Sequence, residues 1–263
     1  AGGYTRNGDC YDPKLGLFVD TLIRFVQKTQ LNEWAFFEKQ NPVNPVRKFC
    51  TAFNNACDAD GLLSVLRYGF KHRGRRFRVC YFQPESALNQ KDAQRYAQNE
   101  ITCNRQWFYS DTTHNSVDMV LAVNGIPVFA FELKNQFTGQ TVENAKQQWM
   151  HDRDPREVCF QFNKRILGYF CVDLTEVWMA TRLAGKDTRF LPFNQGSNGA
   201  GRDGGAGNPP NPNGYLTAYL WEEVFQKDSM MDILQKFMSL HTFNLDAAAE
   251  PVEIQARKGR DAD

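Results

Sequence analysis

Residues 117–135 read VDMVLAVNGIPVFAFELKN, and this stretch decides the fold. Two apolar runs flank Asn124-Gly125, a dipeptide that is typical of the tight turn in a β-hairpin. The second run, 128–131, is apolar at every position, which favours a strand that is buried on both faces within a sheet. The sequence therefore predicts a buried hairpin inside an α/β domain.

Three charged side chains interrupt this apolar hairpin, namely Asp118, Glu132 and Lys134. Because side chains alternate along a strand, Glu132 and Lys134 share one face. A charge among apolar neighbours is costly unless it is paired or binds a metal. Two carboxylates and a lysine at one spot can hold a divalent cation and a water, which predicts a phosphodiester-cleaving site. Taken alone, Glu132 and Lys134 could instead form an exposed ion pair at a strand end.

The register of the hairpin decides whether Asp118 can join such a site. With a two-residue turn, Asp118 lies opposite Phe131, and Asp118 and Glu132 then face opposite sides of the sheet. A three-residue loop, Asn124-Gly125-Ile126 with Gly125 left-handed, would place Asp118 opposite Glu132, and so would a bulge between the strands. We predict one of these two arrangements, and a regular two-residue turn counts against the shared site.

The segments around the hairpin alternate between helical and extended patterns. Helices are predicted from Asp12-Pro13 onward and at about 45–57, 90–100, 141–150, 156–167 and 217–240, and strands at 62–68, 77–82, 106–109, 168–172 and 176–182. This mixture predicts one α/β domain, with a mixed central sheet flanked by helices, over residues 1–190. Residues 191–263 are expected to form a connector and a helix, with a Gly/Asn/Pro-rich stretch at 196–214 and a frayed polar tail from 247.

Composition excludes several classes of protein. The net charge of +1 points neither toward nor away from nucleic acid, and no apolar run is long enough to cross a bilayer. Seven cysteines without a CxxC pair indicate small buried side chains in a reducing cytoplasm rather than zinc ligands or disulfides. No GxxxxGK[ST] motif occurs, so no ATP site is predicted in this chain.

Two further features leave alternatives open. Residues 67–78 hold six Lys/Arg and no acid, which fits either a solvated turn or a surface that contacts the phosphate backbone of nucleic acid. Gln148, on the helix after the hairpin, is either a solvated glutamine or a group that steers a metal-bound water or touches DNA.

Several short stretches together resemble the N-terminal region of the R (HsdR) subunit of type I restriction-modification enzymes. The resemblance spans about residues 3–245 and rests on the hairpin and on residues 3–13 (GYTRNGDCYDP), 62–71 (LLSVLRYGFK), 104–110 (NRQWFYS), 151–157 (HDRDPRE), 180–186 (ATRLAGK), 190–194 (FLPFN), 205–212 (GAGNPPNP) and 219–223 (YLWEE). These stretches are unrelated to one another, so the resemblance is more specific than the hairpin motif alone.

The resemblance implies a restriction-endonuclease-like PD-(D/E)xK fold and a set of site residues. Asp118, Glu132, Lys134 and Gln148 match the expected catalytic positions, and Asp118, Glu132 and Leu133 the expected ligands of Mg²⁺. The family often has a Tyr four residues after the Gln, but Asp152 stands there in this chain. The role of that Tyr is therefore unassigned.

The resemblance also implies an activity and its partners. The activity is that of a type I site-specific deoxyribonuclease, which hydrolyses double-stranded DNA after ATP-driven translocation by a motor region that this chain lacks. The full-length subunit then needs ATP. Its partners are the modification (M) and specificity (S) subunits, and no membrane association is expected. Two alternatives stay open: an inactive DNA-binding or subunit-docking module of the same fold, and a stand-alone repair or recombination nuclease.

Overall fold

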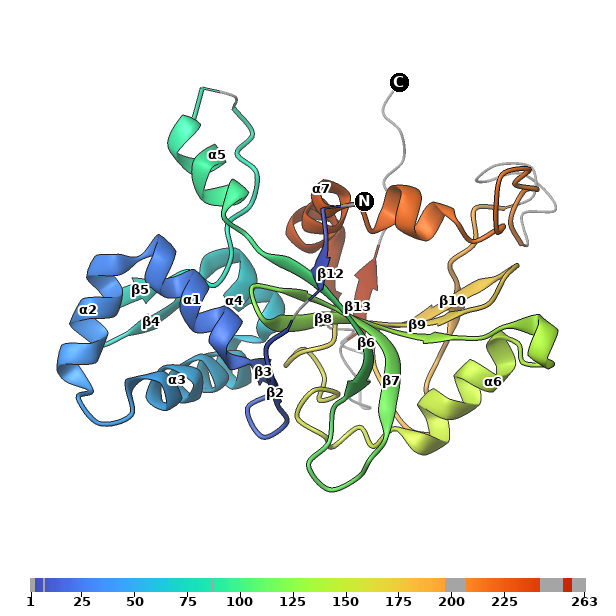
Figure 1. Ribbon diagram of the computed structural model, residues 1–263, viewed down its shortest axis with the longest axis horizontal. Helices are drawn as coiled ribbons and strands as arrows, with labels where there is room; N and C mark the ends of the chain where they lie inside the picture. The colour runs from blue at the N-terminus through green and yellow to red at the C-terminus, as the bar shows by residue number, and fades with distance from the viewer. Residues whose placement is uncertain (1–2, 7, 87, 197–206, 242–252, 257–263) are drawn as a thin grey trace, which may run out of the picture. The chain divides into compact units, whose positions relative to one another are not determined.

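The computed structural model describes residues 3–6, 8–86, 88–196, 207–241 and 253–256 (Figure 1). The chain divides into two compact units. The first unit comprises residues 3–128 together with 156–166, and the second comprises residues 129–155 together with those from 167 onward. The predicted boundary near residue 190 stays a prediction.

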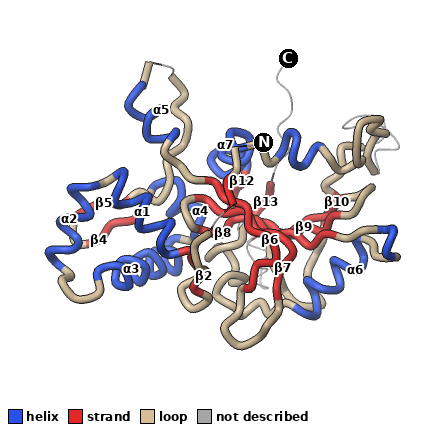
Figure 2. The backbone as a smooth tube through the Cα atoms, viewed as in Figure 1, coloured by secondary structure: helices blue, strands red, loops and turns tan. Residues whose placement is uncertain are grey.

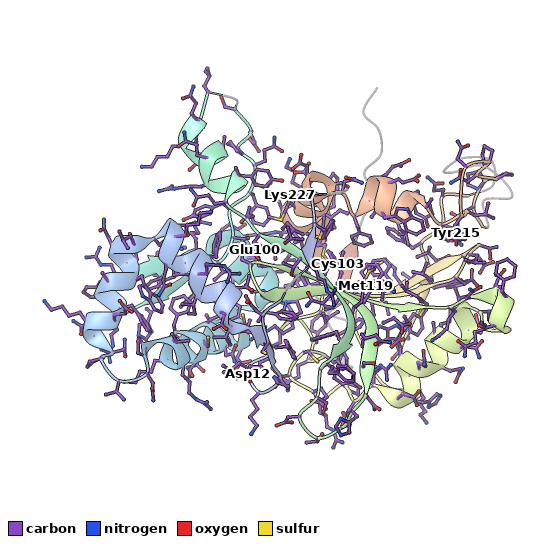
Figure 3. All side chains as sticks on the ribbon, in the orientation of Figure 1. Asp12, Glu100, Cys103, Met119, Tyr215 and Lys227 are labelled. Atoms are coloured by element: carbon purple, nitrogen blue, oxygen red, sulfur yellow. The ribbon has the colours of Figure 1, made fainter. Side chains whose placement is uncertain are left out.

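A seven-stranded mixed sheet, drawn in red in Figure 2, has the order β1-β6-β7-β8-β9-β10-β11. Its strands are β1 (Thr5–Arg6), β6 (Ile101–Phe108), β7 (Ser116–Val123), β8 (Ile126–Leu133), β9 (Gly168–Val172), β10 (Val177–Ala180) and β11 (Leu191–Pro192). β1 pairs with β6 and β8 with β9 in parallel, whereas the β6–β7, β9–β10 and β10–β11 pairs are antiparallel. Cys103 and Met119, labelled in Figure 3, lie on the neighbouring strands β6 and β7. This confirms the prediction of a mixed α/β fold.

The turn of the central hairpin contains two residues, because β7 ends at Val123 and β8 begins at Ile126. Asn124 and Gly125 both have positive φ, 49° and 80°, as a two-residue hairpin turn requires. The Asn124 amide fixes this turn by accepting from Glu100 N at 2.7 Å and donating to the Val79 carbonyl at 2.9 Å. The predicted three-residue loop is therefore wrong, and the alternative, a bulge between the strands, stays a prediction.

Gly125 offers a first testable consequence of this turn. A Cβ at Gly125 would lie 2.4 Å from the Phe18 carbonyl oxygen and 2.9 Å from Leu22 N. We expect Gly125→Ala to lower the free energy of unfolding by more than about 2 kcal/mol, because backbone atoms must shift in addition to the cost of the left-handed conformation. Gly74→Ala is the matched control, since Gly74 has φ 79° but no atom within 4 Å. Equal losses in urea denaturation would contradict this account.

Helices and two short hairpins build the rest of the first unit. These are β2 (Tyr11–Asp12), β3 (Leu17–Phe18), α1 (Val19–Thr29), α2 (Leu31–Gln40), α3 (Pro45–Asp60), α4 (Leu62–Tyr68), β4 (Phe70–His72), β5 (Arg75–Phe77) and α5 (Gln90–Ala97). Aromatic rings form the core beneath β4 and β5: Phe49 lies 5.4 Å from Phe37 and 5.2 Å from Phe77, centroid to centroid. The predicted helices at 45–57 and 90–100 are confirmed.

Four predictions in this unit are wrong. The predicted strand at 77–82 is absent beyond Phe77, where β5 ends. The other three fail for identifiable reasons. No helix begins at Asp12, whose carboxylate instead accepts from Leu15 N at 3.0 Å within the β2–β3 turn. Residues 62–68 form a helix rather than a strand, because Leu62 N and Leu63 N donate to the backbone and side-chain oxygens of Asn163. Residues 156–167 form turns rather than a helix, with Asn163 itself left-handed at φ 51°.

The second unit carries a short 3₁₀ helix η1 (Gln136–Thr138), α6 (Val142–Gln147), the π-helical turns η2 (Gln148–Asp152), η3 (Leu220–Val224) and η4 (Ile233–Phe237), α7 (Lys227–Asp232), β12 (Met238–His241) and β13 (Glu253–Ala256). The predicted single helix over 217–240 is broken after Phe225, where Gln226 is extended. Phe225 packs between Phe129, Phe131 and Phe170, with centroids 5.1–5.3 Å away.

Other predictions for this unit have mixed outcomes. The helix after the hairpin is confirmed through α6 and continues as η2, and the closing strands at 168–172 and 176–182 are confirmed as β9 and β10. Most of the Gly/Asn/Pro-rich stretch, 197–206, and most of the polar tail lie outside the described residues.

All seven cysteines are free thiols, as the absence of paired spacing predicted. Five of them are buried, and burial raises the pKa of Cys80 to about 12, so that its thiol stays protonated at neutral pH. In the part of the chain that the structure describes, no helix combines the length and the apolar character that a membrane span requires.

Candidate active site

Glu132 and Lys134 lie at the end of β8, with their side chains almost fully buried. The Glu132 side chain is 1 % exposed and that of Lys134 is 7 % exposed, whereas Leu133 between them is 44 % exposed. β9 fixes this end of the strand, since Glu132 lies beside Cys171 and Lys134 N donates to the Val172 carbonyl at 2.8 Å. The two charges therefore share the buried face, and the alternative of an exposed ion pair is wrong.

The Glu132 carboxylate lies between two cations. Arg153 Nε and Nη2 donate to Glu132 Oε1 at 3.1 and 2.6 Å, and Lys134 Nζ lies 4.0 Å from Oε2. The shorter contact is in the range of charge-assisted hydrogen bonds, whereas 4.0 Å is the limit for an ion pair. Of these two cations, Arg153 therefore makes the closer contact with Glu132, and its side chain is only 6 % exposed.

The sequence did not mark Arg153 as part of the site. It lies in HDRDPRE (151–157), where several charged residues follow one another without apolar spacing. Most residues of such a run are solvated, so no pattern showed which one is buried. The one available signal was the position of the run, directly after the helix that carries Gln148.

The helix α6 is anchored at its N-terminus to the end of β9. Thr141 caps it, with Oγ1 accepting from Glu143 N at 3.3 Å, which confirms the predicted N-cap. Val142 N donates to the Asp173 carboxylate at 3.2 Å. Burial alone would raise the pKa of Asp173, but hydrogen bonds from the backbone N–H groups of Thr175 and Glu176 outweigh it and lower the pKa. Asp173 therefore stays charged and holds α6 in place.

The π-helical turn η2 presents polar side chains next to Lys134. Trp149 is fully buried and donates from Nε1 to the Phe170 carbonyl on β9 at 3.3 Å. A pocket of about 290 Å³ is lined by Lys134, Gln140, Asn144, Gln147, Gln148, His151 and Asp152. Single π-helical turns inside helices are frequent at functional sites, because they re-aim side chains.

Gln148 contributes an unsatisfied polar atom to this pocket. Its Oε1 is buried and has no hydrogen-bond partner among the described residues. A buried oxygen without a partner costs free energy, and a water or ligand in the adjoining pocket would supply that partner. The alternative of an ordinary solvated glutamine is less consistent with this burial.

Asp118 lies on β7 in the first unit and is half-buried. In the antiparallel pairing of β6 with β7, Arg105 lies opposite Met119 and Trp107 opposite Val117. Gln106 on β6 therefore lies opposite Asp118. Gln106 has φ 48°, an uncommon left-handed conformation in the middle of a strand. Local strain of this kind clusters at functional sites. The approach of Asp118 to Glu132 stays a prediction.

The structure therefore brings together part of the predicted site. Glu132 and Lys134 face each other, and Lys134 and Gln148 line one pocket. Asp152, which replaces the expected Tyr, lines the same pocket. Across the described ranges, no three His, Cys, Asp or Glu side chains gather as a metal cluster.

The chain matches the model of a known protein family. A family model described as type I restriction enzyme R protein N terminus (HSDR_N) matches residues 28–196, which is more than half of the chain. The matched span includes β7, β8, α6 and η2. A search of curated proteins found no match.

Proposed function

The chain belongs to the family of type I restriction enzyme R protein N-termini, and from this premise we propose that it is a Mg²⁺-dependent endonuclease domain with the PD-(D/E)xK fold. Its substrate is double-stranded DNA, in which it hydrolyses phosphodiester bonds. The observation that carries the proposal is the buried Glu132 carboxylate beside Lys134 at the end of a central strand. A charge pair in this position has no evident role in packing, because apolar side chains would fill the same space at less cost.

The donor chemistry of the site fits Mg²⁺. This ion prefers hard oxygen ligands, which the carboxylates of Asp118 and Glu132 and the backbone carbonyl of Leu133 would supply. The buried, unpartnered Oε1 of Gln148 adds an oxygen that can accept from a metal-bound water. When bound, Mg²⁺ polarises the scissile phosphate and lowers the pKa of a coordinated water.

The side chains of this chain supply the remaining functions. The Lys134 ammonium lies in a nearly dry site, where its charge can neutralise a phosphate oxygen that becomes more negative in the transition state. The Gln148 amide oxygen accepts a hydrogen bond from the attacking water and thereby orients it. Arg153 holds the Glu132 carboxylate in position before substrate binds.

The family also supports proposals about the complete enzyme. We propose that this chain acts as the nuclease region of the R subunit, in a complex with modification (M) and specificity (S) subunits and DNA, as a type I site-specific deoxyribonuclease. Residues 191–263 then connect the nuclease region at 1–190 to an ATP-driven motor. We also propose a cytoplasmic location, which the family assignment supports.

Gln148 offers a direct test of the proposed role. We expect Gln148→Met to leave stability unchanged or raise it by up to about 1 kcal/mol, because an unsatisfied buried oxygen is removed. The same change is expected to lower Mg²⁺-dependent nicking of supercoiled plasmid at least about tenfold, because the water loses its acceptor. Gln94→Met, at an exposed glutamine on α5 outside this pocket, is the control and is expected to change neither property. A Gln148→Met protein that is clearly less stable would contradict this account.

A catalytically inactive DNA-binding or docking module of the same fold is the second candidate. Two observations favour it: the two-residue turn at Asn124-Gly125, and the close pairing of Glu132 with Arg153. Titration with Mn²⁺ distinguishes the candidates, because only a nuclease site loses metal binding when Glu132 is replaced by Gln.

A further inference from the structure

The β4–β5 hairpin carries a dense group of positive charges on one face. Phe70 pairs with Phe77 and Lys71 with Arg76. Both phenylalanines are buried in the aromatic core, at 4 % and 0 % exposure. Because successive side chains alternate, Lys71 and Arg76 project together from the opposite, exposed face.

This arrangement costs stability. Like charges directly opposite each other on an antiparallel pair are destabilising, and Lys71 and Arg76 are such a pair. The turn between the strands consists of Arg73 and Gly74, with φ 47° and 79°. The first position of this turn type favours Asn, Asp or Gly, so Arg73 is a poor choice for the turn itself. Arg76 does contribute to folding, since its Nη1 donates to the Tyr68 carbonyl at the end of α4 at 2.6 Å, but this contact does not explain the choice of Lys71 or Arg73.

The exposed face of the hairpin forms one wall of a groove of about 730 Å³. The other wall is a stripe along α3 in which Lys48, Thr51 and Asn55 are exposed. Figure 1 shows β4, β5 and α3 in the same part of the first unit, and α3 contacts β4. Four Lys/Arg side chains line the groove against one acid, Asp60. His72 adds no charge at neutral pH, because burial and then the neighbouring Arg73 lower its pKa.

We propose that this groove binds the phosphate backbone of double-stranded DNA. Its lining consists of cations and small polar donors, the groups that contact phosphate and sugar without reading sequence. A protein partner would require an apolar or aromatic core, and Tyr68, at 60 % exposure, is the only strongly exposed large hydrophobic side chain among the described residues of the groove. The choice of DNA as the ligand rests on the proposed function. The shape and the charge of the groove are independent of that proposal.

A matched pair of double variants tests the proposal. Lys48→Ala/Lys71→Ala removes two exposed charges from the groove, and Lys28→Ala/Lys91→Ala removes two exposed charges from the same unit outside it. Binding to a fluorescein-labelled random-sequence duplex is followed by anisotropy over a salt series in EDTA. We expect the groove variant to bind about tenfold more weakly than the control variant, with a salt slope smaller by about 2. Lys48→Arg/Lys71→Arg is expected to bind as the unchanged chain does.

The remaining outcomes overturn the proposal. Equal weakening by both variants would mean that only bulk charge matters, and unchanged binding by the groove variant would show that the groove does not contact DNA. No duplex binding by the unchanged chain at low salt would overturn it as well. Because EDTA removes metal and no cleavage is measured, the result is independent of the nuclease site. Glu132→Gln, assayed separately for nicking, shows whether the proposed function itself fails.

Discussion

Lys134→Met is expected to lower the rate of Mg²⁺-dependent plasmid nicking by about 10²–10³-fold. Methionine retains most of the volume of the lysine stem but removes the charge that offsets the developing negative phosphate. The effect is large because the ammonium is only 7 % exposed and lies 4.0 Å from Glu132, in a site where water screens little. Initial rates of supercoiled plasmid loss, at saturating Mg²⁺, give the measurement.

Two controls make this result specific. Lys186→Met removes one exposed lysine from the same unit and is expected to nick at the unchanged rate. Lys134→Arg keeps the charge and is expected to retain part of the activity. If Lys134→Met nicks as fast as the unchanged chain, the lysine has no part in the chemistry and the measured activity belongs to another nuclease.

Arg153→Met is expected to lower the free energy of unfolding by about 3–5 kcal/mol in the absence of metal. The substitution leaves the Glu132 carboxylate, at 1 % exposure, without the partner that donates two hydrogen bonds to it. Lys134 at 4.0 Å compensates only in part. Urea denaturation in EDTA measures the loss.

The same variant reports on metal binding. If Glu132 is a metal ligand, Mg²⁺ replaces the missing positive charge and is expected to stabilise Arg153→Met more than it stabilises the unchanged chain. The double variant Glu132→Gln/Arg153→Met removes both charges and is expected to recover stability without any response to Mg²⁺. If Arg153→Met alone is as stable as the unchanged chain, Arg153 is not a stabilising partner of Glu132.

Local pattern predicted the parts of the fold that depend on local interactions. The apolar run at 128–131 identified β8, and alternation correctly placed Glu132 and Lys134 on one face. Thr141 identified the start of α6, because its side chain caps the next turn. In each case the residues that determine the structure lie within a few positions of one another.

The errors arose where distant residues decide the local structure. The stretch 62–68 is largely apolar, which fits a buried strand as well as a helix, but Asn163, a hundred positions away, caps it as a helix. A three-residue loop was one of the two arrangements predicted to bring Asp118 opposite Glu132, whereas the Asn124 amide fixes a two-residue turn through Glu100. Arg153 was missed because its burial depends on the packing of η2 against β9, which no periodicity records.

The location of a bound divalent ion tests the central claim most directly. In crystals soaked with Mn²⁺, anomalous scattering is predicted to show one ion about 2.1 Å from oxygens of Glu132, Asp118 and the Leu133 carbonyl, with Arg153 displaced from Glu132 Oε1. An ion bound elsewhere would contradict the assignment of Glu132 and its neighbours as a nuclease site. The absence of any ion, with Glu132 and Arg153 still paired, would contradict it as well.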